Sequence, residues 1–476
     1  MAALAPPLIV DLDGTLLRSD LLFETGMALV RDAPLRLSRV FNWLARGKAT
    51  LKEGLAQATQ IDVSVLPYDA EVIALIEAER ARGRRVILVT ASHHSLANRI
   101  AGHLQLFDEV IASDAECNLS AQRKCDFLVE RYGRLGFDYM GNSRDDVPVW
   151  AAAREAYVVN PDLGVEGRAR ANGNVRQVIR SNGATARDWA RALRLHQWAK
   201  NLLLFVPLLA AHRFTDPWLL WQGLVAFVLF GLCASSVYLL NDLLDLSDDR
   251  HHHSKCLRPF AAGRLSIRSG VLACPALLAT AIVGAAWLLP WAFAGVLAVY
   301  YALTLAYSLS LKRLMAMDVI VLALLYTIRI VAGAAAFELP LTFWILAFSM
   351  FIFLSLALVK RYAELHAANA RGDAEKTRGR GYYPADFGMI ASLGAASGYL
   401  SVMVLALYIN DQGATNLYAH PHIIWLACPL LLFWITRVWM LTQRGQMNDD
   451  PVVFAIRDRV SLGVGALFGL VFWLAA

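Results

Sequence analysis

The chain has 476 residues, of which 57% are hydrophobic and 18% charged, and a formal net charge of +6. So apolar a chain is not a single soluble globular protein. The modest positive charge gathers beside apolar runs, which favours membrane lipids as partners and argues against nucleic acid. The six cysteines include no CxxC pair, so we expect reduced thiols.

Two parts of different character make up the chain. Residues 1–163 mix charged and apolar residues and are predicted to form a soluble α/β domain. Residues 164–190 are polar and rich in glycine at first and basic and aromatic later, so we expect a linker and an interfacial helix. Residues 191–476 alternate long apolar runs with short charged segments, which predicts an all-α membrane domain.

Polar residues follow the predicted strands of the first part. An apolar strand at Leu8–Val10 is followed by Asp11, Asp13 and a glycine turn. Carboxylates at this place lie at the carboxyl edge of a sheet, where open α/β sheets bind ligands. Further polar residues follow in this order: Thr90 at the end of a second strand, Lys124, and the segment from Gly141 to Asp146.

These four motifs resemble, in the same order, those of the haloacid-dehalogenase-like phosphohydrolases. The resemblance implies a Rossmann-like fold in which Asp11 is the nucleophile that forms an aspartyl-phosphate and Asp13 is the general acid and base. It also implies that Thr90 and Lys124 bind the phosphate and that Asp11, Asp13 and Asp146 hold Mg²⁺. The chemistry is consistent, because Mg²⁺ and a lysine offset the phosphate charge that would repel an attacking carboxylate.

One residue departs from that family's pattern. The last motif usually begins Gly-Asp, whereas here Asn142 follows the glycine. The amide removes one negative charge from the expected metal site and leaves Asp146, with Asp145, to hold the ion. The domain is therefore predicted to be an active phosphatase or, alternatively, a degenerate or regulatory domain. Residues 17–75 have helical apolar spacing and resemble the small cap that closes over such sites.

The second part is predicted to cross the membrane about nine times. Lys and Arg gather in the connections after the even-numbered spans, so the positive-inside rule places those loops in the cytoplasm and the C-terminus outside. The first strand begins without a signal peptide, so we expect the soluble domain on the cytoplasmic face of the inner membrane. The predicted spans are 200–213, 217–240, 269–289, 290–310, 318–337, 341–359, 387–409, 421–441 and 460–476.

Acidic residues end the second predicted span. The spacing of Asp242, Asp245 and Asp249 puts them on one face of a helix. Their mutual repulsion calls for a cation, and Mg²⁺ with a substrate diphosphate supplies one. A solvated acidic helix end remains the alternative. Lys255 and Arg258 follow closely, where they can meet phosphate oxygens.

The acidic segment resembles the first motif of the UbiA-type membrane prenyltransferase superfamily, and the resemblance extends over about residues 190–476. Members of that superfamily have nine membrane helices and bind the diphosphate of their substrate through Mg²⁺ at this motif. The resemblance implies that Asp242, Asp245 and Asp249 are catalytic metal ligands and that Asn241 contacts the substrate.

A second acidic motif, usual in members that prenylate aromatic rings, is absent after the sixth predicted span. Lys360, Arg361 and Glu364 stand there instead. This segment resembles the decaprenyl-phosphate phosphoribosyltransferases, which join phosphoribosyl diphosphate to a polyprenyl phosphate. A basic site suits a monophosphate acceptor better than a neutral ring. The predicted substrate-binding residues of this site are Lys200, Tyr307, Lys312, Lys360, Arg361 and Glu364, although basic residues beside spans also follow from the positive-inside rule alone.

The sequence thus favours a bifunctional membrane enzyme. The membrane domain would transfer a 5-phosphoribosyl group to a polyprenyl phosphate, and the soluble domain would remove the 5-phosphate. A polyprenyl diphosphate-dependent prenyltransferase of aromatic or quinone-precursor acceptors is the first alternative. A transporter or scaffold with relic motifs is the second. The prenyl chain length and the oligomeric state stay open.

Overall fold

The computed structural model describes residues 5–114, 119, 121–181, 183–370, 381–411, 417–447 and 450–476. The chain forms two compact units. The first, here called the N-terminal unit, contains Met1–Leu193 and Tyr238–Pro275. The second, the helical unit, contains Arg194–Val237 and Ala276–Ala476. The acidic segment after the second predicted span therefore belongs to the same compact unit as the soluble domain.

A six-stranded parallel sheet forms the centre of the N-terminal unit, in the order β3-β2-β1-β4-β5-β6. Parallel strands need long crossover connections, which the helices between them supply. The predicted α/β fold is confirmed by this order. The strands are β1 Leu8–Val10, β2 Val86–His93, β3 Glu109–Ser113, β4 Asp138–Gly141, β5 Ala156–Val159 and β6 Val175–Ile179.

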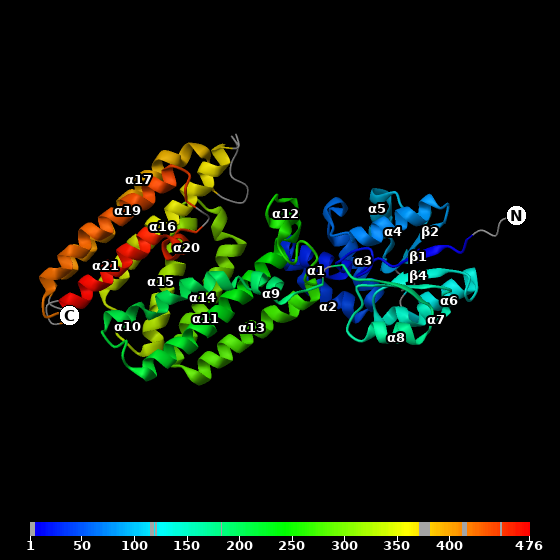
Figure 1. Ribbon diagram of the computed structural model, residues 1–476, viewed down its shortest axis with the longest axis horizontal. Coiled ribbons are helices and arrows are strands. Elements are labelled where there is room, and N and C mark those ends of the chain that lie inside the picture. The colour runs from blue at the N-terminus through cyan, green and yellow to red at the C-terminus, as the bar shows by residue number, and fades with distance from the viewer. Residues whose placement is uncertain are drawn as a thin grey trace. The chain divides into compact units, whose positions relative to one another are not determined.

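Helices cover both faces of the sheet (Figure 1), and the side chains of the central strands are buried on both faces. Successive side chains of a strand point to opposite faces, so Leu8 and Val10 enter one apolar core and Ile9 the other. The first core is closed by α4 Ala70–Ala81 and α5 His94–Leu104. The second is closed by α6 Ala121–Tyr132, α7 Val147–Ala152 and α8 Val165–Ala171.

The linker predicted at 164–190 was wrong in its first part. Residues of this segment form α8 and β6, and β6 pairs with β5 as the last strand of the sheet. An edge strand leaves much of its length exposed, and Arg176 and Gln177 of β6 are exposed, which explains why no apolar pattern marks it. The interfacial helix expected after it is the short α9 Ala186–Ala192.

The helices predicted between residues 17 and 75 are present. They are α1 Leu21–Asp32, α2 Leu37–Ala45 and α3 Lys48–Ala58, and they share a small apolar core of their own. The side chain of Asp20 accepts a hydrogen bond from the Leu22 N–H and so caps α1.

Among the described residues, seven helices are long and apolar enough to cross a membrane, and an eighth span results if the bent pair α20 Pro451–Arg457 and α21 Arg459–Ala475 counts as one. The predicted number of nine is not confirmed. The first predicted span, 200–213, is instead a 3-10 helix, η4 Leu195–Phe205, followed by the short α10 Val206–Ala210. The seven are α11 Pro217–Leu244, α13 Ile267–Leu288, α14 Trp291–Leu309, α15 Met317–Phe337, α16 Phe343–Ala370, α17 Phe387–Ile409 and α19 Ala427–Gln443 with the turn before it.

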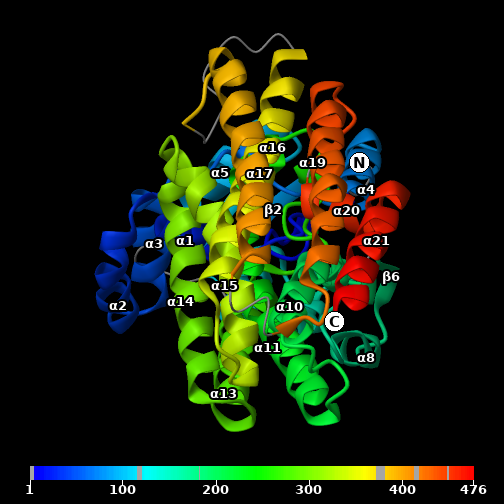
Figure 2. The same ribbon diagram turned by 90° about the vertical axis from the view of Figure 1, so that its left-hand side faces the viewer.

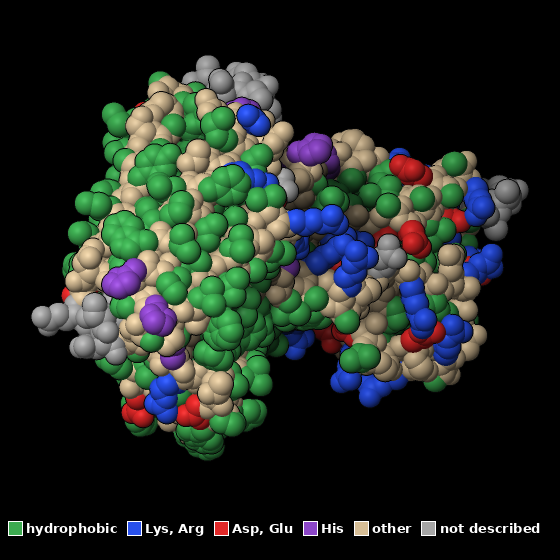
Figure 3. All heavy atoms as spheres, turned by 60° about the vertical axis from the view of Figure 1, so that its left-hand side comes forward, with side chains coloured by type: hydrophobic (Ala, Val, Ile, Leu, Met, Phe, Trp, Pro, Cys, Tyr) green, Lys and Arg blue, Asp and Glu red, His purple; other side chains and the backbone are tan. Residues whose placement is uncertain are grey.

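The helices of the helical unit pack side by side, with α16 against both α15 and α17 (Figure 2). Hydrophobic side chains predominate on the face of the bundle seen in Figure 3. Trp287, Trp291 and Phe343 are 85%, 77% and 73% exposed. Long helices whose backbone bonds are internal and whose outer side chains are apolar suit a lipid environment. The chain is therefore a multi-pass membrane protein.

Candidate functional site

Three charged residues predicted from the sequence meet at the carboxyl edge of the sheet. The Lys124 Nζ donates a hydrogen bond of 2.8 Å to Asp11 Oδ1 and lies 3.5 Å from Asp146 Oδ1. Tyr139 lies between them, because its hydroxyl accepts from Lys124 at 2.9 Å and donates to Asp146 at 2.7 Å. Tyr139 was not predicted from the sequence, because it looks like an ordinary strand residue.

Burial and charge set the proton affinities of these groups. Burial raises the pKa of Asp11 to about 7, although the neighbouring Lys124 opposes the shift. Burial also acts on Asp146, but there Lys124 and several hydrogen bonds outweigh it and the pKa is lowered. One lysine thus neutralises only part of the carboxylate charge at this edge of the sheet.

Asp13 is held by two donors. Its Oδ1 accepts from the Leu21 N–H at 2.8 Å and its Oδ2 from the Ser92 hydroxyl at 2.6 Å. Burial raises the pKa of Asp13 to about 6, which suits a group that must release and regain a proton near neutrality. Ser92 escaped the sequence analysis, although a hydroxyl two residues beyond Thr90 was a usable signal.

Thr90 is buried in β2 and does not end that strand, which was the expectation; β2 continues to His93. The hydroxyl oxygen of Thr90 accepts a hydrogen bond of 2.9 Å from the Ser92 N–H. The register of β2 against β3 shifts between Thr90 and His93. Such an irregularity bends the strand locally. Ser92, which donates to Asp13, lies within this irregular stretch.

The asparagine that departs from the family pattern contacts the first motif. Thr15 donates a hydrogen bond of 3.3 Å to Asn142 Oδ1. Gly14 has a φ of +76°, and a Cβ at that residue would come within 2.2 Å of the Asn142 amide nitrogen. Only glycine therefore fits both the turn and the close approach. Asp145 is exposed and does not substitute for the missing carboxylate.

The donor atoms at this edge fit Mg²⁺ by their chemistry, since carboxylate and amide oxygens are its preferred protein ligands. Asp11, Asp13 and the amide oxygen of Asn142 would hold the ion. Asp146 would act indirectly, because it accepts from the backbone N–H groups of Asn142 and Ser143 and so positions this loop. Over the described residues as a whole, no group of three His, Cys, Asp or Glu side chains is arranged to hold a metal. The expected direct role of Asp146 as a ligand is thus not supported by its contacts.

The acidic segment is organised by one arginine. Arg258 Nη1 donates to Asp242 Oδ1 at 3.0 Å and to Asp249 Oδ2 at 2.7 Å. Both carboxylates are about 3% exposed, and burial raises the pKa of Asp249 to about 6. Two buried carboxylates that share one cation have negative charge to spare, so the oxygen donors here also fit Mg²⁺.

The single helix predicted for the acidic segment is interrupted. The helix α11 ends at Leu244, and α12 Leu246–His251 begins after Asp245, which lies between them. The Asp249 N–H still donates to the Asp245 carbonyl at 2.8 Å, so one helical hydrogen bond spans the start of α12. Asn241 and Asp245 are half-buried beside this break. The Lys255 side chain is exposed, but its charge acts on Asp249 and opposes the rise that burial causes in the pKa of that carboxyl.

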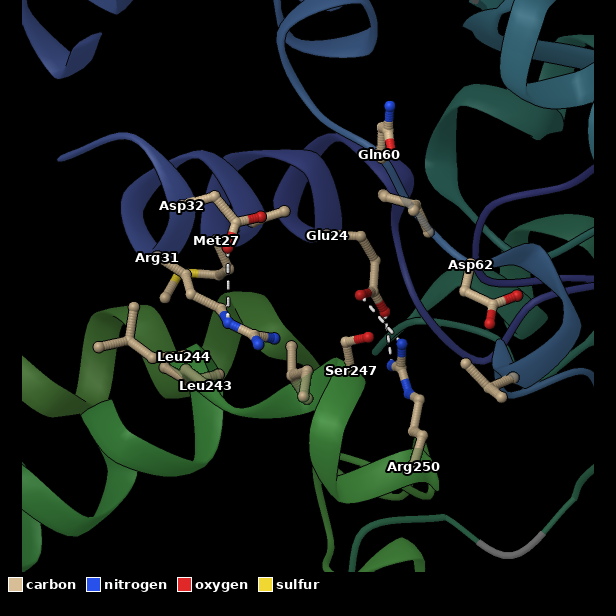
Figure 4. A pocket seen from close by; sticks show the side chains of 14 residues that line it. Glu24, Met27, Arg31, Asp32, Gln60, Asp62, Leu243, Leu244, Ser247 and Arg250 are labelled. Atoms are coloured by element: carbon tan, nitrogen blue, oxygen red, sulfur yellow. Dashed lines mark hydrogen bonds and ion pairs between the residues drawn. The ribbon is translucent and has the colours of Figure 1, made fainter. Parts of the chain in front are cut away.

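An ion pair that the sequence did not predict fixes the end of the acidic segment. Glu24 of α1 pairs with Arg250 of α12 through bonds of 2.6 and 3.1 Å, and both side chains are only 5% exposed. The two side chains meet directly, and both line a cavity of about 200 Å³ (Figure 4). The Ser19 hydroxyl donates a further bond of 2.5 Å to Glu24. This pair joins the phosphatase-like domain to the residue next to Asp249.

Glu24→Gln is expected to destabilise the N-terminal unit by about 3–5 kcal/mol, because it leaves the Arg250 guanidinium buried without its counter-charge. The matched control is Asp248→Asn, since Asp248 pairs with Arg31 of the same helix at 2.9 Å but is 66% exposed. That exposed pair contributes about 0–1 kcal/mol. Thermal unfolding of the purified full chain should show a lower Tm for the first variant only. Equal Tm values for the two variants would contradict a stabilising buried pair.

In the helical unit, several predicted basic residues gather around a carboxylate that the sequence analysis missed. Lys200 of η4 forms a short ion pair with Asp450, and the Tyr326 hydroxyl lies 3.4 Å from the same carboxylate. Lys360 of α16 interacts electrostatically with both Lys200 and Asp450. Arg329 of α15, buried among aromatic rings, also interacts electrostatically with Lys200.

We call this group of Lys200, Lys360, Arg329 and Asp450 the basic cluster. Arg329 Nε donates to the Asn201 side chain at 3.3 Å. A charged residue in the middle of an apolar run is a functional signal, and Arg329 interrupts the fifth predicted span. Three cations and one carboxylate leave a net positive charge, which suits an anion.

Arg361 lies next to the basic cluster in sequence but is neutralised locally. It pairs with Asp318 and Glu364 through short contacts and donates to the Tyr307 hydroxyl at 3.0 Å. Its side chain is 2% exposed. Arg361, Tyr307 and Glu364, all predicted to bind substrate, thus form an internal network with Asp318. Lys312 lies in the short turn η6 Leu311–Arg313 and is half-buried.

Comparison with known proteins supports both parts of the sequence analysis. A model of the UbiA prenyltransferase family matches residues 202–462, and a model of haloacid dehalogenase-like hydrolases matches residues 8–149. The second match accounts for the motifs around Asp11, and the first for those from Asn241 onward.

Relatives resemble the chain over different lengths. An uncharacterized protein, y4nM, of Sinorhizobium fredii is 40% identical over 473 residues, which cover 98% of this chain and 91% of that protein. Nodulation protein NoeC of Azorhizobium caulinodans is 38% identical over 287 residues, or 60% of this chain and 92% of that protein. Decaprenyl-phosphate phosphoribosyltransferase of Mycobacterium tuberculosis is 32% identical over 275 residues, or 57% and 88%.

The first family model covers more than half of the chain, and the matched residues include the acidic segment and Arg258. The chain therefore belongs to the UbiA prenyltransferase family and carries a haloacid dehalogenase-like hydrolase domain at its N-terminal end.

Proposed function

We propose that the protein is a bifunctional enzyme of the cytoplasmic membrane. Its transferase part moves a 5-phosphoribosyl group from phosphoribosyl diphosphate to a polyprenyl phosphate. Its N-terminal hydrolase domain then removes the 5-phosphate from the lipid-linked product. The hydrolase domain and the charged loops face the cytoplasm in this proposal, and the C-terminus lies on the outer side.

The observation that carries the choice of acceptor is the basic cluster. A phosphate monoester needs fixed positive charge, and among the described residues of the basic cluster three cations, Lys200, Lys360 and Arg329, stand against one carboxylate, Asp450. Glu364 also acts on Lys360 but is itself paired with Arg361. A neutral aromatic ring would gain nothing from that charge. The resemblance to decaprenyl-phosphate phosphoribosyltransferase supports the same choice.

The acidic segment is the proposed site of the donor. Asp242, Asp245 and Asp249, with Asn241, would hold Mg²⁺, which would stabilise the departing diphosphate. Arg258 already shares its guanidinium between two of these carboxylates and is free to exchange them for diphosphate oxygens of the same charge. The acceptor phosphate oxygen then forms the bond to ribose C1 as the bond from C1 to the diphosphate breaks.

The hydrolase step uses the sheet edge. Asp11 attacks the 5-phosphate, the bond from phosphorus to the ribose oxygen breaks, and Asp13 gives its proton to that oxygen. Water then attacks the aspartyl-phosphate while Asp13 takes back a proton, which releases phosphate. Lys124 stays protonated beside Asp11 in both steps. Burial lowers the pKa of Lys124, but the carboxylates of Asp11 and Asp146 outweigh burial and raise it to about 12. Mg²⁺ at the same edge would neutralise further phosphate charge.

A direct assay tests this proposal. Membranes that contain the protein are supplied with labelled phosphoribosyl diphosphate and a polyprenyl phosphate, and the lipid extract is examined for a lipid-linked pentose. We expect label in the lipid fraction that depends on both substrates. If labelled polyprenyl diphosphate instead prenylates an aromatic acid and no pentose enters the lipid, the alternative of a ring prenyltransferase is correct.

A further inference from the structure

Exposed apolar side chains gather on α2 of the cap and in the turn before it. On α2, Leu37, Phe41 and Leu44 are 37%, 74% and 54% exposed, and Leu35 in the preceding turn is 94% exposed. The spacing of four and then three residues puts Leu37, Phe41 and Leu44 on one face of the helix. We call these four residues the outer stripe.

The outer stripe is not needed for the fold of the cap. A different face of α2, which carries Val40 and Trp43, packs on the small core formed by α1 and α3. Burying a side chain such as leucine or phenylalanine is worth about 1.5–3 kcal/mol. Four such side chains left together in water are unusual for a soluble domain and mark a surface that binds something.

Charge identifies the kind of partner. Four exposed basic residues, Arg36, Arg39, Arg46 and Lys48, lie on or beside α2, and the chain has no acidic residue between Asp32 and Glu53. The fifth basic residue of this stretch, Lys52, is turned inward and donates to the Ala91 carbonyl at 2.6 Å. At 100° per residue, Arg39 and Arg46 lie on the side of α2 opposite the outer stripe, so the helix has an apolar face and a basic one. Apolar and basic residues together are typical of helices that lie in the headgroup layer of anionic membranes.

The N-terminal unit is also attached to the membrane at two points. It contains the end of α11, at Leu244, and the beginning of α13, at Ile267. Both helices are long and apolar enough to span a bilayer. The unit that carries α2 is therefore tethered to the surface of the bilayer.

We propose that α2 docks into the headgroup layer of an anionic membrane, with Phe41 and Leu44 inserted among the acyl chains. Docking fixes the cap, because α2 and α3 share one apolar core. This inference does not rest on the chemistry proposed for either domain.

The test is hydrogen exchange of the full chain in nanodiscs of phosphatidylglycerol or of phosphatidylcholine. Amides of residues 34–46 should exchange at least about fivefold more slowly in the anionic discs, the factor that one basic side chain near such a surface is worth. The variant R36E/R39E/R46E should lose this difference. F41E/L44E should exchange quickly in both kinds of disc.

The matched control is R123E/R134E/R168E, which reverses three exposed arginines elsewhere in the same unit and should leave the exchange of residues 34–46 unchanged. Equal exchange in the two lipids would overturn the proposal. So would slow exchange that depends on protein concentration in neutral discs, because a second copy of the chain would then cover the outer stripe.

Discussion

Asp11→Asn is expected to make the 5-phosphorylated lipid accumulate while transfer to the lipid continues. The variant lacks the proposed nucleophile but keeps its shape, and Lys124 retains Tyr139 and Asp146 as neighbours. Loss of a nucleophile lowers the rate by at least about 10³-fold. Mass spectrometry of lipid extracts, after supply of phosphoribosyl diphosphate, measures the ratio of phosphorylated to dephosphorylated lipid-linked pentose.

Asp145→Asn is the matched control for this experiment, because it makes the same chemical change at an exposed carboxylate of the same domain. It should leave the ratio as in the unaltered protein. A ratio that Asp11→Asn does not change would show that the hydrolase domain has another substrate or is degenerate, as Asn142 would then explain. The transferase proposal would survive that outcome.

Asp242→Asn is expected to abolish most transfer to the lipid. The carboxylate is 3% exposed and shares Arg258 with Asp249, so its removal weakens both the proposed metal site and the position of the arginine. Removing one such group from the centre that stabilises a departing anion costs about 10²–10³-fold in kcat. The measurement is incorporation of labelled pentose into lipid, with the amount of protein in the membrane checked in parallel.

Asp248→Asn controls for charge in the same segment, since Asp248 lies one residue before Asp249 but is 66% exposed. It should retain full transfer. If Asp242→Asn also transfers at the normal rate, the acidic segment is only a solvated helix end and the donor binds elsewhere. Phosphatase activity of the hydrolase domain on a simple phosphate ester should be the same in both variants, which separates this outcome from misfolding.

Several strands, the order of the motifs and most of the apolar spans were predicted correctly from the sequence. The order of strand, aspartates, lysine and last motif predicted the parallel sheet, and Lys124 does meet Asp11. Apolar runs also located six of the spans within four residues at either end, whereas α16 extends beyond the predicted end at 359 to Ala370. Strands and spans are local or repeat along the chain, so periodicity and spacing reveal them. Lys124 and Asp11 are 113 residues apart, and their meeting was implied by the family resemblance instead.

Features that depend on distant parts of the chain escaped. Arg329 and Asp450 acquire their partners only when separate elements pack, because Asn201 lies 128 residues from Arg329 and Tyr326 lies 124 residues from Asp450. The partners of Tyr139 are only 7 and 15 residues away, but a tyrosine in a buried strand carries no sign that its hydroxyl is hydrogen-bonded. The edge strand β6 was missed for a different reason, because exposed strand residues carry no apolar alternation. The break at Asp245 was missed because i, i+3 and i, i+4 spacing survives a local bend.

The ion pair of Glu24 and Arg250 has a consequence for the history of the molecule. The helix α1 starts at Leu21, whose N–H holds Asp13, and Glu24 follows within one turn. The first turn of α1 thus contacts both the hydrolase motif, through Leu21 and Asp13, and the end of the acidic segment, through Glu24 and Arg250. If the hydrolase domain and the transferase part became separate proteins, Glu24 and Arg250 would each be a buried charge without a partner. We therefore expect the two parts to remain in one chain unless both residues change together.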